Sequence, residues 1–187
     1  EENKLVFITG PLTGTNSPCA GRFMVVSKQP LNNRIGSANS GGVWGAKLKY
    51  SGIDALIVEG KADKPVRLFI EDDHIEIIEA EELWGTTLRE LTGKLEEVHG
   101  DKSSTLAIGP AGEHLSKISC IMNDEDRAAG RGGLGAVMGS KNLKAITVIA
   151  TKGVIEPQDK DAMSKAFKES MAKIKENTVL STGLPTY

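Results

Sequence analysis

The chain has 187 residues, 39% of them hydrophobic and 26% charged, which is typical of one soluble globular domain. Its formal net charge of −2 gives no global positive field for nucleic acid or anionic lipid, so an anion site would have to be built locally. Two cysteines, Cys19 and Cys120, are too few for a disulfide framework or an all-cysteine metal site. No apolar run approaches about 18 residues and no signal-peptide pattern is present. We therefore expect a cytoplasmic protein that binds neither nucleic acid nor a membrane.

The first part of the chain predicts strands separated by glycine-rich loops. Residues 4–9 (KLVFIT) and 22–28 (RFMVVSK) are rich in β-branched and aromatic residues and predict two strands joined by one long loop. Residues 41–51 predict a loop and a short helix, which Gly52 would end before a strand in DALIVEG (54–60). Apolar residues alternate on both sides of Asp72-Asp73 within residues 66–80, which predicts a β-hairpin.

The second part predicts a similar series. Residues 86–98 place four apolar residues on one helical face, with Thr86 or Thr87 as the N-cap. Strands are predicted at 104–109 and 116–124, and a second glycine-rich loop then leads to a short helix in LGAVMGSK and a strand in KAITVIA. After Pro157 an amphipathic helix is predicted from about 159 to 177. Its apolar face comprises Ala162, Ala166, Phe167, Met171 and Ile174.

The two halves of the chain resemble each other. FITGPLTG (7–14) matches LAIGPAGE (106–113), and residues 38–61 match residues 128–152 with one gap. Each half reads strand, Gly-Pro loop, strand, Gly-Gly loop, short helix and strand. We therefore predict an internal pseudo-twofold duplication over about residues 5–61 and 104–152, which would create two similar binding loops.

Each glycine-rich loop is a candidate anion site. A glycine-rich turn that opens a helix exposes unpaired N–H groups that favour phosphate, and arginines can add charge-assisted hydrogen bonds. Arg127 and Arg131 adjoin the second loop, and Arg22 and Arg34 precede the first. Such glycines can equally serve tight turns and close helix packing. GRGGLG (130–135) lacks the preceding strand and following acidic residue of a dinucleotide site, and no P-loop is present. The residues alone predict an α/β or α+β domain with a duplicated polyanion site.

Longer motifs carry a family resemblance. These are GPLTGT (10–15), ANSGG (38–42), SGIDALIVEGKADKP (51–65), IGPAGE (108–113), IMNDEDRAAGRGGLGAVMGSKNLKAI (121–146) and GLPTY (183–187). Together they resemble the N-terminal cofactor-binding domain of the aldehyde ferredoxin oxidoreductase family of tungsten enzymes. The resemblance implies an α+β fold, a cradle of mixed β-sheet with a few helices. It also implies a bis-pterin binding domain at residues 1–152, lacking its N-terminal strands, and a helical segment at 153–187 that leads toward later domains.

The resemblance also implies a site. In that family two pyranopterin dithiolenes hold one tungsten, or sometimes molybdenum. The resemblance assigns Arg22, Asn39 and Gly41 to one pterin and Arg127, Ala128, Gly130 and Arg131 to the other. Backbone carbonyls of Asn39 and Ala128 would help to hold a magnesium ion that joins the two pterin phosphates. The family commonly has Gly-Gly-Arg where this chain has Ala20-Gly21-Arg22, so the loop is expected to follow a different path there.

The implied activity belongs to a longer protein. It would oxidise aldehydes to carboxylic acids in anaerobic metabolism and pass electrons through a 4Fe-4S cluster to ferredoxin. The cluster ligands and acid–base residues would lie in later domains, so no catalytic residue is assigned here and the fragment alone is not expected to be active. Expected partners are ferredoxin, the remaining domains and a second copy in a homodimer. The alternatives are a subunit of a related multisubunit reductase acting on a non-aldehyde substrate, and a non-catalytic phosphate-binding module.

Overall fold

The computed structural model describes residues 2–124 and 126–177; the GLPTY motif lies outside them. The first half contains β1 (Leu5–Thr9), β2 (Phe23–Lys28), β3 (Ile35–Ser40), α1 (Trp44–Tyr50) and β4 (Ala55–Val58). A central segment follows, with β5 (Val66–Glu71), β6 (His74–Glu79), the 3-10 helix η1 (Glu81–Leu83) and α2 (Leu88–His99). The second half contains β7 (Ser104–Ala107), α3 (Pro110–Glu113), β8 (Ile121–Asn123), β9 (Arg127–Ala129), α4 (Leu134–Ser140) and β10 (Leu143–Ile149), and α5 (Lys160–Glu176) comes last.

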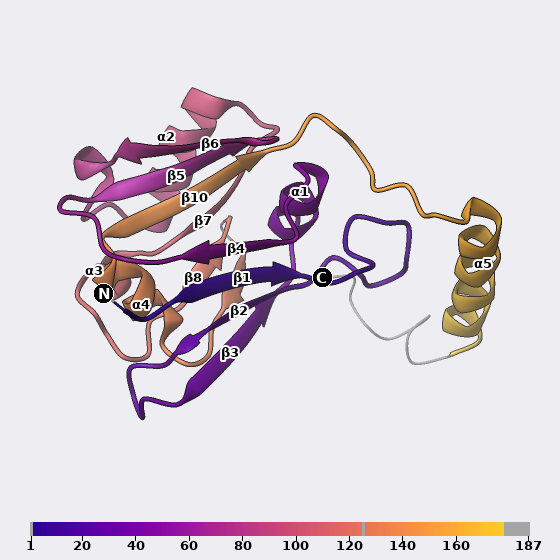
Figure 1. The fold of residues 1–187 in the computed structure, drawn as a ribbon, viewed down its shortest axis with the longest axis horizontal. Helices are drawn as coiled ribbons and strands as arrows, with labels where there is room; N and C mark the ends of the chain where they lie inside the picture. The colour runs from indigo at the N-terminus through magenta and orange to yellow at the C-terminus, as the bar shows by residue number, and fades with distance from the viewer. Residues whose placement is uncertain (1, 125, 178–187) are drawn as a thin grey trace.

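The strands form two sheets that confirm the α+β fold and the internal duplication (Figure 1). The first sheet has the order β3-β2-β1-β4, and the second has the order β6-β5-β10-β7-β8-β9. Within the second sheet, the run β9-β8-β7-β10 repeats the order of the first, and all of its neighbouring strands are antiparallel in both copies. In both copies a short helix precedes the last strand. The β5–β6 hairpin, predicted around Asp72-Asp73, extends the second sheet by pairing β5 parallel to β10.

Strand register makes the equivalence specific. Phe7 on β1 lies opposite Val25 and Leu56, and Leu106 on β7 lies opposite Asn123 and Ile146. Phe7 and Leu106 are therefore equivalent, as the sequence match of 7–14 with 106–113 predicts.

One core joins the two halves. Helices α1 and α4 each contact strands of both sheets, and residues 134–139 of α4 are all buried. Trp44 on α1 is fully buried against Phe7 and Phe23 of the first sheet, with ring centroids 5.7 and 4.9 Å apart. Its indole N–H donates a 3.1 Å hydrogen bond to the carbonyl of Ile146 on β10. The chain has few aromatics, and this buried cluster contains three of them.

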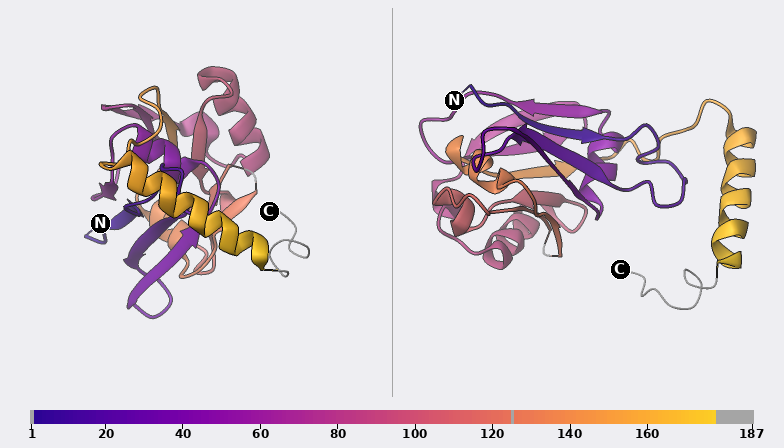
Figure 2. Two further views of the ribbon diagram at one scale, coloured as in Figure 1. Left: turned by 90° about the vertical axis from the view of Figure 1, so that its right-hand side faces the viewer. Right: turned by 90° about the horizontal axis from the view of Figure 1, so that it is seen from below.

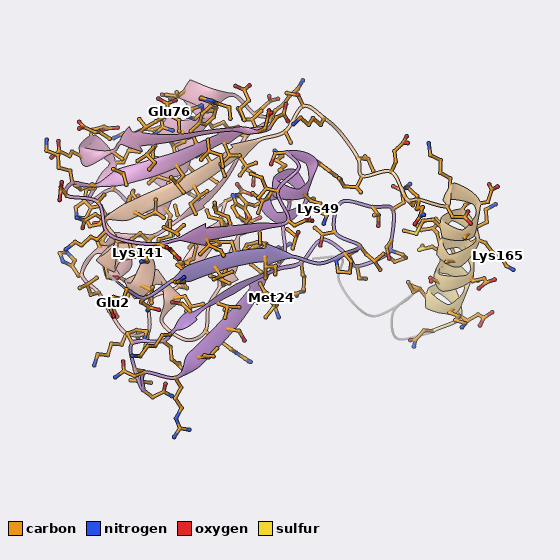
Figure 3. The ribbon with its side chains drawn as sticks, viewed as in Figure 1. Glu2, Met24, Lys49, Glu76, Lys141 and Lys165 are labelled. Carbon is orange, nitrogen blue, oxygen red and sulfur yellow. The ribbon has the colours of Figure 1, made fainter. Side chains whose placement is uncertain are left out.

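The outer faces of the two sheets differ. Helix α2 packs Leu91 and Leu95 against Ala107 and Ala145 of the second sheet. Thr87, one of the two residues predicted as the N-cap, is the N-cap of α2 and forms a capping box with Glu90. On the first sheet, by contrast, Ile8, Ile35 and Ile57 are exposed. Figure 3 marks Met24 on β2 of this sheet.

The end of the described chain lies away from the sheets. An extended segment after β10 leads to α5, which stands apart from both sheets (Figures 1 and 2). Asp159 caps the helix, and none of its described residues is buried, so its predicted apolar face is not covered within the described residues. No helix among the described residues is long and apolar enough to span a membrane.

Two predictions of local structure need correction. The strand predicted at 116–124 covers only Ile121–Asn123, because residues 116–119 form a hydrogen-bonded turn in which Ser119 N–H donates to Ser116 O. The sequence also contains no clear signal for β3 or β9, and the expectation that no strand precedes GRGGLG is wrong, because β9 ends at Ala129. Both are edge strands of small or polar residues that are defined by pairing with β2 and β8.

Candidate anion-binding site at the junction of the two halves

A cavity of about 570 Å³ lies where the two halves meet. It is lined by the loop that precedes β2, the end of β3 with the loop that leads to α1, and the start of β9 with the residue before it. The lining residues are Cys19, Gly21, Arg22, Ser40, Gly41, Gly42, Val43, Asp126, Arg127 and Ala128. A larger hollow of about 680 Å³ beneath α5 is lined by the linker, Asn16 and Phe167 and contains no arginine. The two arginines make the junction cavity the better candidate for an anion.

Edge strands of the two sheets meet at this junction. Strand β3 is the edge of the first sheet, β9 is the edge of the second, and the two contact each other. Asn39 on β3 lies opposite Met24, and Ala128 on β9 lies opposite Met122. The register thus places Asn39 and Ala128 at equivalent positions of the two halves. An edge strand leaves backbone N–H and C=O groups unpaired by its sheet, so both positions can offer carbonyl oxygens.

The arginines approach the cavity from different halves. The Arg22 guanidinium donates to the Asn39 side-chain oxygen, which ties the start of β2 to β3. Arg22 and Asn39 are both exposed, whereas Arg127 is half-buried. Each guanidinium can donate two parallel hydrogen bonds to a phosphate or carboxylate. Among the described residues of the lining, Asp126 is the acidic group, so these residues carry a positive balance from the two arginines.

The glycines of the first loop leave room for a ligand. A Cβ built at Gly41 would meet no atom of the described residues within 4 Å, and its φ is not positive. Gly42 has a φ of +86°, a left-handed conformation that favours glycine, and a Cβ there would overlap the amide of Asn123. Gly41 therefore leaves the cavity open, while Gly42 shapes the turn.

The second glycine-rich loop is used largely for packing. A Cβ at Gly133, Gly135 or Gly139 would clash with the backbone of Lys117, Cys120 or Gly112, respectively. The N–H of Gly135 donates to Ser119 O at 3.1 Å, so the expectation of free N–H groups throughout this loop is wrong in part. Gly130 lines a separate hollow of about 150 Å³ with Gln29, Leu31, Lys117, Ile118, Gly132 and Gly133. Arg131 is exposed.

The structure thus brings most of the expected site together. Arg22, Gly41, Arg127 and Ala128 line the cavity, and Asn39 adjoins it through Arg22. Gly130 and Arg131 follow β9 and do not line it. Sequence reasoning missed Asn123, whose buried amide supports the loop. For Cys19 it favoured a small residue in a tight turn over a residue that faces the site, whereas Cys19 is exposed in the lining. The closeness of Cys19 to Arg22 in the sequence was the signal that could have placed Cys19 in the lining. No such signal was available for Asn123.

Residues 1–150 match the family described as aldehyde ferredoxin oxidoreductase, N-terminal domain. The chain is 52% identical over its whole length to the tungsten-containing aldehyde ferredoxin oxidoreductase of Pyrococcus abyssi. This chain belongs to the aldehyde ferredoxin oxidoreductase family. It spans 31% of the length of that relative.

Other proteins similar to this chain are named for different functions. The chain is 37% identical, over 90% of its length, to the aliphatic sulfonate oxidoreductase WOR-like subunit of Pyrococcus furiosus, of which it covers 29%. Among solved structures, it resembles the active site complex BamBC of benzoyl coenzyme A reductase in complex with 1,5-dienoyl-CoA. The TM-score is 0.86 and the identity 31%, over 98% of this chain and 28% of the other. The family fold therefore occurs in proteins named for different substrates.

Proposed function

We propose that residues 1–152 form the bis-pterin binding part of a tungsten- or molybdenum-dependent oxidoreductase, and that residues 153–187 lead into its further domains. One observation carries the proposal: Arg22 and Arg127, from two topologically equivalent halves, line one cavity. A site to which each half contributes one guanidinium, with an open backbone at Gly41, fits a ligand made of two similar halves that each carry a phosphate.

The residues have distinct roles in this proposal. Arg22 and Arg127 donate charge-assisted hydrogen bonds to the two phosphates. Carbonyls of Asn39 and Ala128, at equivalent edge positions, hold a magnesium ion between them, because Mg²⁺ prefers oxygen ligands. Gly41 lets the backbone approach one pterin. Gly130 and Arg131, which follow the end of β9, contact the second pterin. The bound cofactor supplies two-electron redox chemistry at its metal.

In the whole protein, this cofactor would support oxidation of an aldehyde to a carboxylic acid, with water as the oxygen source and two protons released, and the two electrons would pass through a 4Fe-4S cluster to ferredoxin. The tungsten-containing relative at 52% identity supports this activity. Ligands of the cluster and the catalytic residues belong to later domains. We further propose a cytoplasmic homodimer. The likeness to BamBC supports one second candidate, a subunit of a multisubunit reductase that uses the same cofactor on a different substrate.

The test is elemental analysis for tungsten, molybdenum and iron, with pterin fluorescence after oxidation, on full-length protein purified without oxygen from its own host. About one tungsten or molybdenum and two pterins per chain are expected. Protein that is folded but free of metal and pterin would instead support a phosphate-binding module. Activity on aldehydes then separates the two enzyme candidates.

Gly41→Ala tests the location of the site. The added Cβ meets no described atom in the free protein, so the cofactor-free protein should keep its thermal midpoint. In the loaded protein the methyl group would press on the ligand, and overpacking of this kind costs about 1–3 kcal/mol, so cofactor content should fall about tenfold. Gly93→Ala on α2, also without a described atom within 4 Å, is the matched control and should load normally. Normal loading of Gly41→Ala would place the cofactor elsewhere.

A further inference from the structure

Asn123 is a buried amide at a position where the fold accepts an apolar side chain. It lies on β8, 1% exposed, opposite Leu106 on β7 and Arg127 on β9. The equivalent residue of the first sheet is Val25, which is opposite Phe7 and fully buried. Packing alone therefore does not require an amide at position 123.

The amide of Asn123 connects the two halves of the site. Its Nδ2 donates to the carbonyl of Gly41, in the loop of the first half. A Cβ at Gly42 would overlap this Nδ2 and would lie 3.5 Å from Cγ of Arg127. The first glycine loop therefore rests directly on Asn123 and beside the Arg127 side chain, and both Gly41 and Arg127 line the junction cavity.

The same amide lowers the stability of the fold through its other atom. Oδ1 of Asn123 is buried and has no hydrogen-bond partner among the described residues. A buried acceptor without a donor costs free energy, and a valine at this position would avoid that cost. Groups that a fold retains against its own stability are concentrated at functional sites.

We propose that Asn123 is a positioning residue of the cofactor site. By holding the Gly41 carbonyl from β8, it fixes the spacing between the Gly41 backbone and the Arg127 guanidinium, so that both meet one ligand. This inference rests on the proposed function. A positioning role differs from a structural role, because removal of the amide should weaken cofactor binding without weakening the fold.

The test compares three variants of the full-length protein. Each variant is produced once in the presence of tungstate and once in the absence of both tungstate and molybdate. Asn123→Val copies the first half, and Asn123→Asp keeps the shape but, when ionised, cannot donate to Gly41. Both should lose about 10- to 100-fold in tungsten and pterin per folded chain, the usual effect of removing a supporting partner of a metal site. Cofactor-free Asn123→Val should keep or raise its thermal midpoint. Val25→Ala, the control, should lower the midpoint and retain tungsten per folded chain.

The outcomes are distinct. Wild-type loading by both Asn123 variants would overturn this inference while leaving the proposed function intact. A fall in midpoint of cofactor-free Asn123→Val like that of Val25→Ala, with loading unchanged, would assign Asn123 a structural role and overturn it too. Wild-type protein without tungsten, molybdenum or pterin would overturn the proposed function and this inference together.

Discussion

At the scale of single residues, His99 shows how neighbouring groups change the pKa of an imidazole. Its Nε2 lies 2.8 Å from Nη1 of Arg67, and its ring stacks on Phe69 with centroids 4.3 Å apart. Burial first, and then the positive charge of Arg67, lower the pKa of His99 below its ordinary value of 6.5. His99 is therefore neutral in the folded state at pH 7 and accepts a hydrogen bond from Arg67.

This pKa shift predicts a pH dependence of stability. Below pH 6.5 the unfolded state binds a proton at His99 before the folded state does, so stability is lost as the pH falls from 6.5 through the folded pKa. His99→Gln keeps an acceptor for Arg67 but does not titrate. We expect its thermal midpoint to fall less than that of the wild type between pH 7.5 and 5. His74→Gln, exposed on β6, is the control, and equal pH profiles for wild type and His99→Gln would contradict the argument.

At the scale of elements, a buried ion pair connects β10, α3 and the turn before α2. Lys144 and Glu113 pair with side chains that are 0% and 2% exposed. The N–H of Gly85 donates to both Glu113 oxygens at 3.0 and 2.9 Å, and Lys144 Nζ donates to Thr86 O at 3.2 Å. These contacts attach α2, the cover of the second sheet, to two elements of the second half.

Lys144→Met should destabilise the protein by about 3–5 kcal/mol, because it leaves the Glu113 carboxylate buried without its partner. The double variant Lys144→Met/Glu113→Gln removes both charges and should be less destabilised than Lys144→Met alone. Urea unfolding of the two variants, monitored by the helical circular dichroism signal to which α2 contributes, measures the difference between their free energies of unfolding. An equal or greater loss of unfolding free energy in the double variant would contradict this argument. It would show that the buried Glu113 carboxylate is not stabilised by the charge of Lys144.

The sequence predicts some elements well and others poorly for a physical reason. Runs such as 22–28 and the hairpin around Asp72-Asp73 carry their own propensity and turn chemistry, so both were predicted correctly. Strands β3 and β9 consist of IGSANS and RAA and exist because β2 and β8 pair with them. These unpredicted strands carry Asn39 and Ala128. Residues alone therefore suggested an anion site in each loop, and only the contact between β3 and β9 brings the two positions to one junction.

Glycine illustrates the same limit. Within the second loop and α4, the sequence cannot distinguish a glycine that faces a ligand from one against which backbone packs. The structure assigns Gly133, Gly135 and Gly139 to close backbone contacts, and leaves Gly41 and Gly130 open. The distinction depends on neighbours distant in sequence, such as Gly112 beside Gly139, and these are not encoded in the local pattern.

At the scale of the whole molecule, the two halves should unfold together, because α1 belongs to the cores of both. Trp44→Phe would keep the aromatic contacts with Phe7 and Phe23 but remove the hydrogen bond to the Ile146 carbonyl. Loss of such a buried partner costs about 1–3 kcal/mol. In hydrogen exchange of the full-length protein, the slowest amides of β2 and β10 should therefore lose protection by the same factor. A loss confined to β10 would mean that the sheets unfold separately, and that the shared cavity forms only when two independently stable halves dock.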